Sequence, residues 1–242
     1  MNVKEYKRRI RERIWRLLEE KNIAAFPRPV YGRIPNFLGA DKAARKLFSL
    51  KIWKTSKVVK VNPDSPQKAV RLQALHEGKL LLMPTPRLRE GFILLDPKLI
   101  PRRYYYEAST IRGAFKWGRI VSLDEIPKVD LITIGSVAVD QTGTRIGKGG
   151  GYAELEYGIL KQIGRVSDTT PIATTVHDIQ VLKEELPREE HDLPVDVIIT
   201  PTKIIEASKP FPKPPGIIWR LVTEDMLNKI KPLRELKRKQ SY

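Results

Sequence analysis

Residues 131–154, LITIGSVAVDQTGTRIGKGGGYAE, join an apolar run to a glycine-rich segment and then to a helical pattern. Four glycines fall within the five positions 147–151. Because glycine has no Cβ, it accepts positive φ angles and lets backbone N–H groups approach a polyanion closely. A helix that begins directly after the glycines points the positive end of its dipole at the same place, and Arg145 and Lys148 add charge. The stretch therefore predicts a phosphate-binding loop between a buried strand and a helix.

The generic phosphate-binding motifs do not fit this loop. A Walker loop needs Ser or Thr after its lysine, whereas Gly149 follows Lys148 here. The dinucleotide pattern G-x-G-x-x-G can start at Gly147, but Tyr152 occupies its sixth position. A flexible surface turn therefore stays open as the alternative to a phosphate site.

Three apolar segments, residues 129–139, 172–176 and 195–199, predict strands that are buried on both faces. Because helical patterns alternate with such strands, we expect an α/β fold, a Rossmann-like three-layer sandwich with a mostly parallel central sheet. Ribose-phosphate isomerases and CoA-transferases share this topology, but the chain shows no matching pattern of catalytic acids. Ligands of such sheets bind at the carboxyl ends of the strands, where we expect the glycine-rich segment, His177-Asp178 and Thr200-Pro201-Thr202 to converge.

The composition limits the classes of protein that this chain can belong to. It has 242 residues, no cysteine and a formal net charge of +17. Disulfides and thiolate metal sites are thereby excluded, and the three histidines are too far apart in sequence to suggest a zinc site. No apolar run is long enough to cross a membrane and no secretory signal is visible, so we expect a cytoplasmic protein. The charge favours anionic partners such as ATP, a polyglutamylated cofactor or RNA, although a solvated basic surface explains it equally well.

A basic amphipathic helix is predicted over residues 2–21. Asn2 can cap it with Glu5 three residues later, and Lys7 and Arg11 lie one turn apart on the same face. The Pro- and Gly-rich residues 26–39 predict a long ordered loop. Further expected elements are helices over 41–50 and 66–76, and strands over 58–61, 79–83, 92–95 and 217–221. We assign residues 1–207 to one α/β domain and residues 208–242 to a Pro-rich and basic extension.

The glycine-rich segment also resembles a known family signature. Residues 145–152 are similar to the Arg-Leu-Gly-x-Gly-x-Gly-Tyr-Tyr-Asp signature of the 5-formyltetrahydrofolate cyclo-ligase (methenyltetrahydrofolate synthetase) family, and residues 191–196 resemble its second acidic element. Over residues 7–220 the chain specifically resembles the methenyltetrahydrofolate synthetase domain-containing subgroup. The phrases that carry this wider resemblance are Phe26–Val30, Arg33–Phe37, Pro84–Arg89 and Thr175–Asp178. Some members of the subgroup carry an RNA-recognition domain, and we expect none in this chain.

The resemblance implies a reaction and its cofactors. The family closes 5-formyltetrahydrofolate to 5,10-methenyltetrahydrofolate with ATP and Mg²⁺. The formyl oxygen attacks the γ-phosphate, N10 then adds to the activated carbon, and phosphate leaves. Phosphoryl transfer depends on positioning and on charge neutralisation more than on a covalent protein catalyst. The expected substrate is therefore a reduced folate or a related pterin, with tetrahydromethanopterin as a variant.

The resemblance also assigns roles to individual residues. The loop carries the catalytic candidates Arg145 and Tyr152, and the ATP-binding set is completed from the first helix and the glycines: Lys7, Arg11, Arg145, Gly147, Lys148, Gly149, Gly150, Gly151 and Tyr152. Glu154 and Asp196 occupy the acidic positions that hold Mg²⁺. Arg87 and Arg89 are the candidate substrate-binding cations, although they can equally face solvent.

Departures from the family pattern leave a second function open. The usual Tyr-Tyr-Asp-Arg has become Tyr152-Ala153-Glu154-Leu155, which lengthens the acidic side chain and removes an aromatic ring. A catalytically altered family member that binds RNA or nucleotides is therefore the alternative. The basic first helix and the basic residues 231–239 favour it, and the small aromatic content of 7% argues against it. The sequence leaves a monomer and a homodimer equally open.

Overall fold

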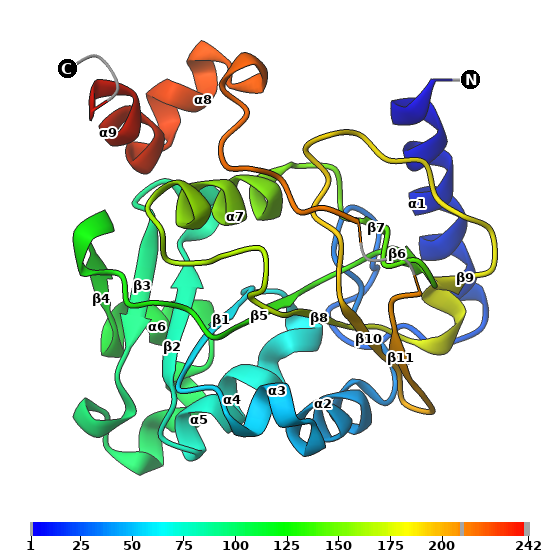
Figure 1. The fold of residues 1–242 in the computed structure, drawn as a ribbon. Helices are drawn as coiled ribbons and strands as arrows, with labels where there is room; N and C mark the ends of the chain where they lie inside the picture. The colour runs from blue at the N-terminus through cyan, green and yellow to red at the C-terminus, as the bar shows by residue number, and fades with distance from the viewer. Residues whose placement is uncertain (1, 209–210, 240–242) are drawn as a thin grey trace.

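An eight-stranded sheet runs through the part of the chain that the structure describes, residues 2–208 and 211–239 of this computed structural model (Figure 1). In spatial order its strands are β11 (Ile204–Glu206), β10 (Val197–Ile199), β8 (Ile172–Thr175), β5 (Leu131–Ile134), β1 (Val58–Val61), β2 (Leu80–Pro84), β3 (Phe92–Leu95) and β4 (Arg119–Val121). The five strands from β10 to β2 are parallel, and the pairs at both edges are antiparallel. The prediction of an α/β fold with a mostly parallel central sheet is confirmed.

The strand predicted over residues 129–139 is divided in two. β5 ends at Ile134, and the chain then enters a separate three-stranded sheet that consists of β7 (Arg145–Ile146), β6 (Ala138–Asp140) and β9 (Val181–Leu182). The change of direction occurs at Gly135, where a Cβ would lie 2.6 Å from Cγ2 of Ile34. The prediction of one continuous strand is therefore wrong, because the packing of the 26–39 loop against Gly135 was not visible in the apolar pattern.

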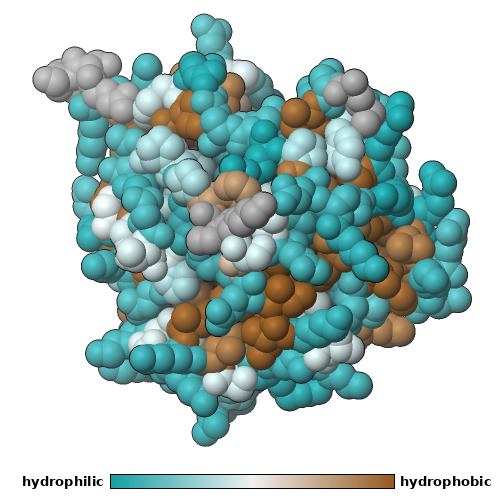
Figure 2. Space-filling model, turned by 45° about the vertical axis from the view of Figure 1, so that its right-hand side comes forward, coloured by the Kyte–Doolittle hydropathy of each residue, from teal (hydrophilic) through white to brown (hydrophobic). Residues whose placement is uncertain are grey.

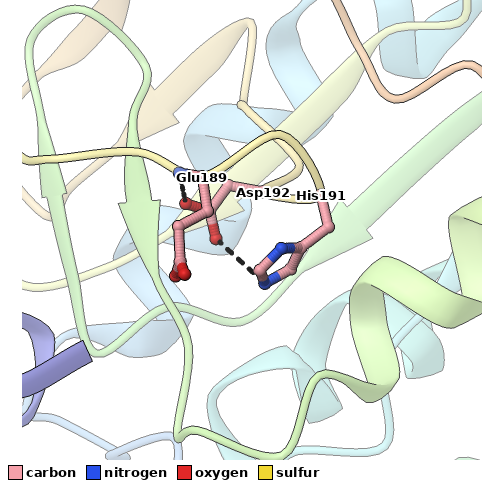
Figure 3. A group of neighbouring side chains, drawn as sticks. All are labelled: Glu189, His191 and Asp192. Carbon is pink, nitrogen blue, oxygen red and sulfur yellow. Dashed lines mark hydrogen bonds and ion pairs between the residues drawn. The ribbon is translucent and has the colours of Figure 1, made fainter. Parts of the chain in front are cut away.

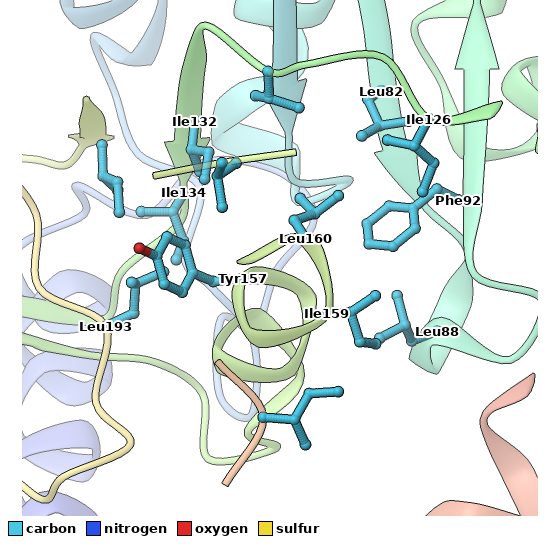
Figure 4. Close-up of a cluster of buried hydrophobic side chains, with 14 of the residues drawn as sticks. Leu82, Leu88, Phe92, Ile126, Ile132, Ile134, Tyr157, Ile159, Leu160 and Leu193 are labelled. Carbon is cyan, nitrogen blue, oxygen red and sulfur yellow. The ribbon is translucent and has the colours of Figure 1, made fainter. Parts of the chain in front are cut away.

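Helices cover both faces of the central sheet. One face packs against α2 (Ala40–Ser49), α3 (Lys51–Lys54), α4 (Lys68–His76), α5 (Tyr105–Ala108) and α6 (Ile111–Trp117). The opposite face packs against α7 (Tyr152–Gln162), from which Tyr157, Ile159 and Leu160 meet the sheet (Figure 4). Side chains of a strand alternate between the two faces, so the same strands supply both apolar clusters.

The predicted amino-terminal helix is confirmed as α1 (Val3–Glu20), with Asn2 as its cap. The Asn2 side-chain oxygen accepts a hydrogen bond from the backbone N–H of Glu5 at 2.8 Å. The apolar face of α1 packs against the small sheet and the 26–39 loop, through Ile14 and Leu18 on the helix and Val30 and Ile146 opposite. This packing places the basic face of α1 beside the glycine-rich segment.

Residues 211–239 lie on the α7 face of the molecule. They include α8 (Glu224–Lys229) and α9 (Lys231–Lys239), and Ile217, Ile230, Leu233 and Leu236 belong to the same apolar cluster as the buried side chains of α7. The edge strand predicted over 217–221 is wrong: residues 219–221 form a 3-10 turn. The segment crosses α7 at Gly158 instead, where a Cβ would lie 3.0 Å from the Gly216 carbonyl oxygen. The predicted boundary between an α/β domain ending at residue 207 and an extension starting at residue 208 stays a prediction.

Within the described part of the chain, no helix has the combination of length and hydropathy needed to cross a bilayer. Hydrophilic side chains cover most of the face in Figure 2, and apolar groups lie between them.

Candidate active site

A cleft of about 1100 Å³ opens at the carboxyl ends of β1, β2 and β5. Residues 62–65 after β1, 84–87 at the end of β2 and Gly135 after β5 line it. The remaining walls come from α1, the 26–39 loop, the glycine loop (residues 147–151), the acidic segment (residues 189–192) and α8. The position agrees with the rule that ligands of parallel sheets bind at the carboxyl ends of the strands.

The glycine-rich segment, His177-Asp178 and Thr200-Pro201-Thr202 were expected to converge at this edge of the sheet, and they do so only in part. Thr200 donates a hydrogen bond to Oδ1 of Asp178 at 2.7 Å, so these two predicted segments do meet. Neither of them lines the cleft, however. Asp178 is held by threonine hydroxyls, and this hydrogen bonding lowers its pKa despite partial burial, which acts in the opposite direction. We therefore leave the 177–178 and 200–202 segments out of the site.

The glycine loop lies directly against α1. Gly149 adopts φ +99°, and a Cβ there would lie 3.4 Å from the Arg11 guanidinium carbon. Gly151, with φ +66°, precedes Tyr152, where α7 begins. The loop, the start of α7 and the Arg11 side chain thus meet at one point of the cleft. Partial burial lowers the pKa of Arg11, but a guanidinium remains charged at neutral pH.

Arg145 is buried at the back of this loop, with 3% of its surface exposed. It donates a hydrogen bond to the Gly135 carbonyl oxygen at 3.0 Å and forms an ion pair with Glu154. Because Glu154 lies in the first turn of α7, this pair ties the helix start to the end of β5. Lys148, on the loop itself, reaches Oδ1 of Asp64 at 3.3 Å. All four of these charged residues line the cleft.

Lys7 joins α1 to the acidic segment, which the sequence analysis did not select as a whole. Its ammonium nitrogen lies 2.8 Å from Oε2 of Glu189 and 2.5 Å from Oδ2 of Asp192. Ligand atoms of Glu189, His191 and Asp192 all lie within 4.8 Å of one another (Figure 3). Glu189 and Asp192 are therefore site residues that sequence reasoning missed. The available signal was the acidic element over residues 191–196, from which Asp196 was chosen instead.

The structure does not bring Asp196 together with Glu154. Asp196 precedes β10, at the amino end of that strand, where it accepts hydrogen bonds from the Ile172 backbone N–H and from Lys213, each at 2.8 Å. It is absent from the residues that line the cleft. These contacts account for its carboxylate without a metal ion, and its role in binding Mg²⁺ remains an untested prediction.

Of the two predicted substrate-binding arginines, Arg87 lines the cleft and Arg89 does not. Arg87 has φ +54°, a left-handed conformation that is uncommon for a residue with a side chain. The Arg89 carbonyl oxygen accepts a hydrogen bond from the backbone N–H of Lys231. The first residue of α9 is thus hydrogen-bonded to the turn between β2 and β3. The left-handed backbone conformation of Arg87 fixes where its side chain starts.

Sequence reasoning also missed a buried ion pair at the floor of the cleft, in which Glu156 lines the cleft and its partner Lys60 lies behind it. Lys60 on β1 pairs with Glu156 on α7, and their side chains are 2% and 5% exposed. Asn62 accepts from Lys60 at 2.9 Å and donates to Glu156 at 3.2 Å. Burial raises the pKa of Glu156, although Lys60 opposes the shift. No spacing in the sequence reveals this pair, because its members are 96 residues apart.

The arrangement combines groups suited to binding a polyphosphate. Backbone N–H groups of a glycine loop, a helix amino terminus and cations from α1 and β7 meet in one cleft, which also contains carboxylates able to hold a hard cation. Positioning and charge neutralisation are the chemistry that these loop, helix and charged groups offer.

Comparison with known proteins identifies the family of this chain. The sequence model of the 5-formyltetrahydrofolate cyclo-ligase family matches residues 3–201. The methenyltetrahydrofolate synthase domain-containing protein of Bos taurus is 45% identical over 234 residues, which cover 96% of this chain and 62% of the bovine protein. The corresponding Homo sapiens protein is 44% identical over 235 residues, which cover 96% of this chain and 61% of the human protein. The chain thus spans less than two thirds of the length of these relatives.

A solved structure, that of Aquifex aeolicus 5,10-methenyltetrahydrofolate synthetase, shares the fold. It has a TM-score of 0.54 at 22% identity, and the match covers 87% of this chain and 95% of that protein. The resemblance seen in residues 145–152 and in the wider phrases is confirmed by the extent of the family match and by the identity to the two relatives. The chain belongs to the 5-formyltetrahydrofolate cyclo-ligase family.

Proposed function

We propose that this protein is a ligase that uses ATP and Mg²⁺ to close 5-formyltetrahydrofolate, or a related reduced pterin, to the 5,10-methenyl form. Membership of the cyclo-ligase family supports the type of reaction. The single observation that carries the proposal is the glycine loop packed against Arg11, at the mouth of a cleft that Lys7 and Arg145 also line.

The glycine loop fits the phosphates of ATP. Gly149 adopts φ +99°, a backbone conformation that residues with a side chain rarely adopt, so glycine lets the loop keep this shape beside Arg11. Lys148 and Arg11 are placed to neutralise phosphate oxygens, and the start of α7 contributes its dipole. ATP, when bound, supplies the phosphoryl group that turns the formyl oxygen into a leaving group.

The carboxylates that line the cleft fit Mg²⁺ in their donor type. Glu154, Glu189 and Asp192 offer the oxygen ligands that this ion prefers. The Lys7 ammonium already lies between Glu189 and Asp192, so this point of the cleft attracts a cation. Mg²⁺ would neutralise phosphate charge there. The residues themselves bind and orient: Arg145 holds Glu154, and Lys7 holds the acidic segment against α1.

Binding of RNA, the second function considered, receives less support. Much of the positive charge on α1 is already paired within the chain: Arg8 with Glu5 and Glu12, and Arg13 with Glu184. On α9, Lys231 and Arg234 are exposed, so this helix keeps a basic surface. RNA binding therefore stays a prediction, which a salt titration of RNA affinity would test.

The proposed reaction is tested by mixing purified protein with Mg-ATP and 5-formyltetrahydrofolate and following methenyltetrahydrofolate by its absorbance. We expect ATP-dependent turnover that Glu154→Ala reduces strongly. Exposed Glu224→Ala, on α8, is the matched control and should leave the rate unchanged. Normal ATP binding without turnover, with the folate and with tetrahydromethanopterin derivatives alike, would show that the reaction is wrong while the nucleotide site is right.

A further inference from the structure

Part of the cleft wall is formed by residues that lie beyond the region matched by the family model. That match ends at residue 201, whereas Leu221 and Met226 line the cleft. The bovine and human relatives match over 96% of this chain, which leaves few residues unmatched. The carboxyl-terminal segment is thus a shared part of this type of protein, and two of its side chains reach the site.

The segment that carries this wall is fixed at several points. Ile230 and Leu233 are buried in the apolar cluster that also contains Tyr157, Ile159 and Leu160 of α7. On one side of the cleft, the Lys231 backbone N–H donates to the Arg89 carbonyl oxygen at 3.0 Å, and on the other Arg220 forms an ion pair with Glu190 of the acidic segment. The segment therefore spans the cleft from the β2–β3 turn to the acidic segment, and Leu221 is held between these anchors.

The wall differs in chemistry from the rest of the cleft. Leu221 is 42% exposed and Ile111, which also lines the cleft, is 44% exposed, although neither side chain gains from contact with water. The cations Lys7, Arg11 and Arg145 lie at the α1 and glycine-loop side. An apolar wall inside a charged cleft is the place where an apolar part of a ligand is buried.

The size of the cleft leaves room for such a ligand beside a nucleotide. Pockets that enclose one drug-sized molecule measure roughly 300–1000 Å³. This cleft measures about 1100 Å³. The polyphosphate part of a nucleotide is drawn to the glycine loop, so the apolar wall is available to the second reactant.

We infer that Leu221, supported by Met226, is a specificity-determining residue that packs against the planar bicyclic ring of the one-carbon substrate. The inference rests on the proposed function for the identity of that substrate. The wall recognises the shape and apolarity of the ring, while Arg87, on the β2–β3 turn that α9 braces, faces its anionic part. The carboxyl-terminal segment is in consequence a component of the substrate site.

Isothermal titration calorimetry of the full chain tests this directly, with 5-formyltetrahydrofolate and a non-hydrolysable ATP analogue titrated separately. Leu221→Ala should weaken folate binding about tenfold, as expected when a ligand loses the methylenes that line its pocket. Leu221→Asp should weaken it further, and binding of the ATP analogue should change less than about twofold in both variants. Because Leu221 is partly exposed, neither change should unfold the protein, and Glu224→Ala serves as the control on α8.

Three results would overturn the inference. Weakened binding of the ATP analogue instead of the folate would place the adenine ring on this wall. Unchanged binding of both ligands would show that Leu221 contacts neither. Wild-type protein that binds the ATP analogue but no reduced folate would contradict the proposed function itself, and with it the ligand assigned to the wall.

Discussion

The buried pair of Lys60 and Glu156 offers a quantitative test of how the cleft floor is held. Both side chains are almost fully buried, at 2% and 5% exposure, and Asn62 bonds to each. The change that we consider is Lys60→Met, which keeps the side-chain volume and removes the charge. It leaves the Glu156 carboxylate without its cation in a site where burial already raises its pKa.

The expected cost follows from this burial. Removing one partner of a buried ion pair typically destabilises a protein by about 3–5 kcal/mol, because the remaining charge is neither solvated nor paired. The matched control is Lys229→Met. Its partner is Asp225, and the two side chains are 62% and 70% exposed. For such an exposed pair we expect a loss below about 0.5 kcal/mol.

A second substitution separates lost charge balance from lost packing. In the double variant Lys60→Met/Glu156→Gln, the amide carries no charge and can still bond to Asn62. We expect it to recover at least about half of the loss, since replacing both charges of a buried pair is often nearly neutral.

Urea denaturation followed by circular dichroism measures the free energy of unfolding of all four proteins: the wild type, both single variants and the double variant. Equal losses for Lys60→Met and Lys229→Met would refute the reasoning, because burial would then make no difference to the pair. A double variant less stable than Lys60→Met would show that packing, and not the unpaired carboxylate, sets the cost.

Three further predictions concern the glycine-rich segment. Gly149→Val should weaken ATP binding by more than about tenfold, because the position has φ +99° and faces the Arg11 side chain; equilibrium binding of a fluorescent ATP analogue measures this, and unchanged affinity would contradict the loop's role. Glu154→Ala should lower the turnover rate about 10–100-fold while ATP binding persists, since Arg145 keeps its bond to the Gly135 carbonyl oxygen; a parallel loss of ATP affinity would point to a collapsed loop instead. Gly143→Ala should destabilise the fold by about 1–3 kcal/mol, because φ is +89° and a Cβ would lie 2.3 Å from the Val195 carbonyl oxygen; an unchanged melting temperature would contradict this.

Much of the fold follows from local patterns in the sequence. The apolar residues of β5, β8 and β10 predict buried parallel strands because a strand covered on both faces needs apolar side chains on both of them. Asn2 and the spacing of apolar residues locate α1 nearly to the residue. These features could be predicted because each depends on neighbours within a few positions along the chain.

The predictions that were wrong depended on segments distant in sequence. The strand over residues 129–139 breaks at Gly135 because Ile34 packs there, and residues 217–221 leave the sheet edge because Gly158 admits their backbone. Neither contact alters the apolar pattern of the segment that it redirects. The apolar pattern therefore predicts a longer strand than the structure has, because packing against a distant segment ends the strand without changing the pattern.

The sequence by itself determined which chemical groups the glycine-rich segment offers. Glycines, arginine and lysine in the order of residues 145–152 predict a phosphate-binding loop, because tolerance of positive φ and positive charge are properties of these residues wherever they lie. Only the tertiary structure decided which acids accompany the loop. Lys7 meets Glu189 and Asp192 across 182 and 185 residues, and Asp196, four positions beyond Asp192, is turned to the far end of its strand. Such pairings depend on how α1, the two sheets and the carboxyl-terminal segment pack together. Ion pairs form between residues that are close in space, and the spacing of residues in the sequence does not show which residues those are.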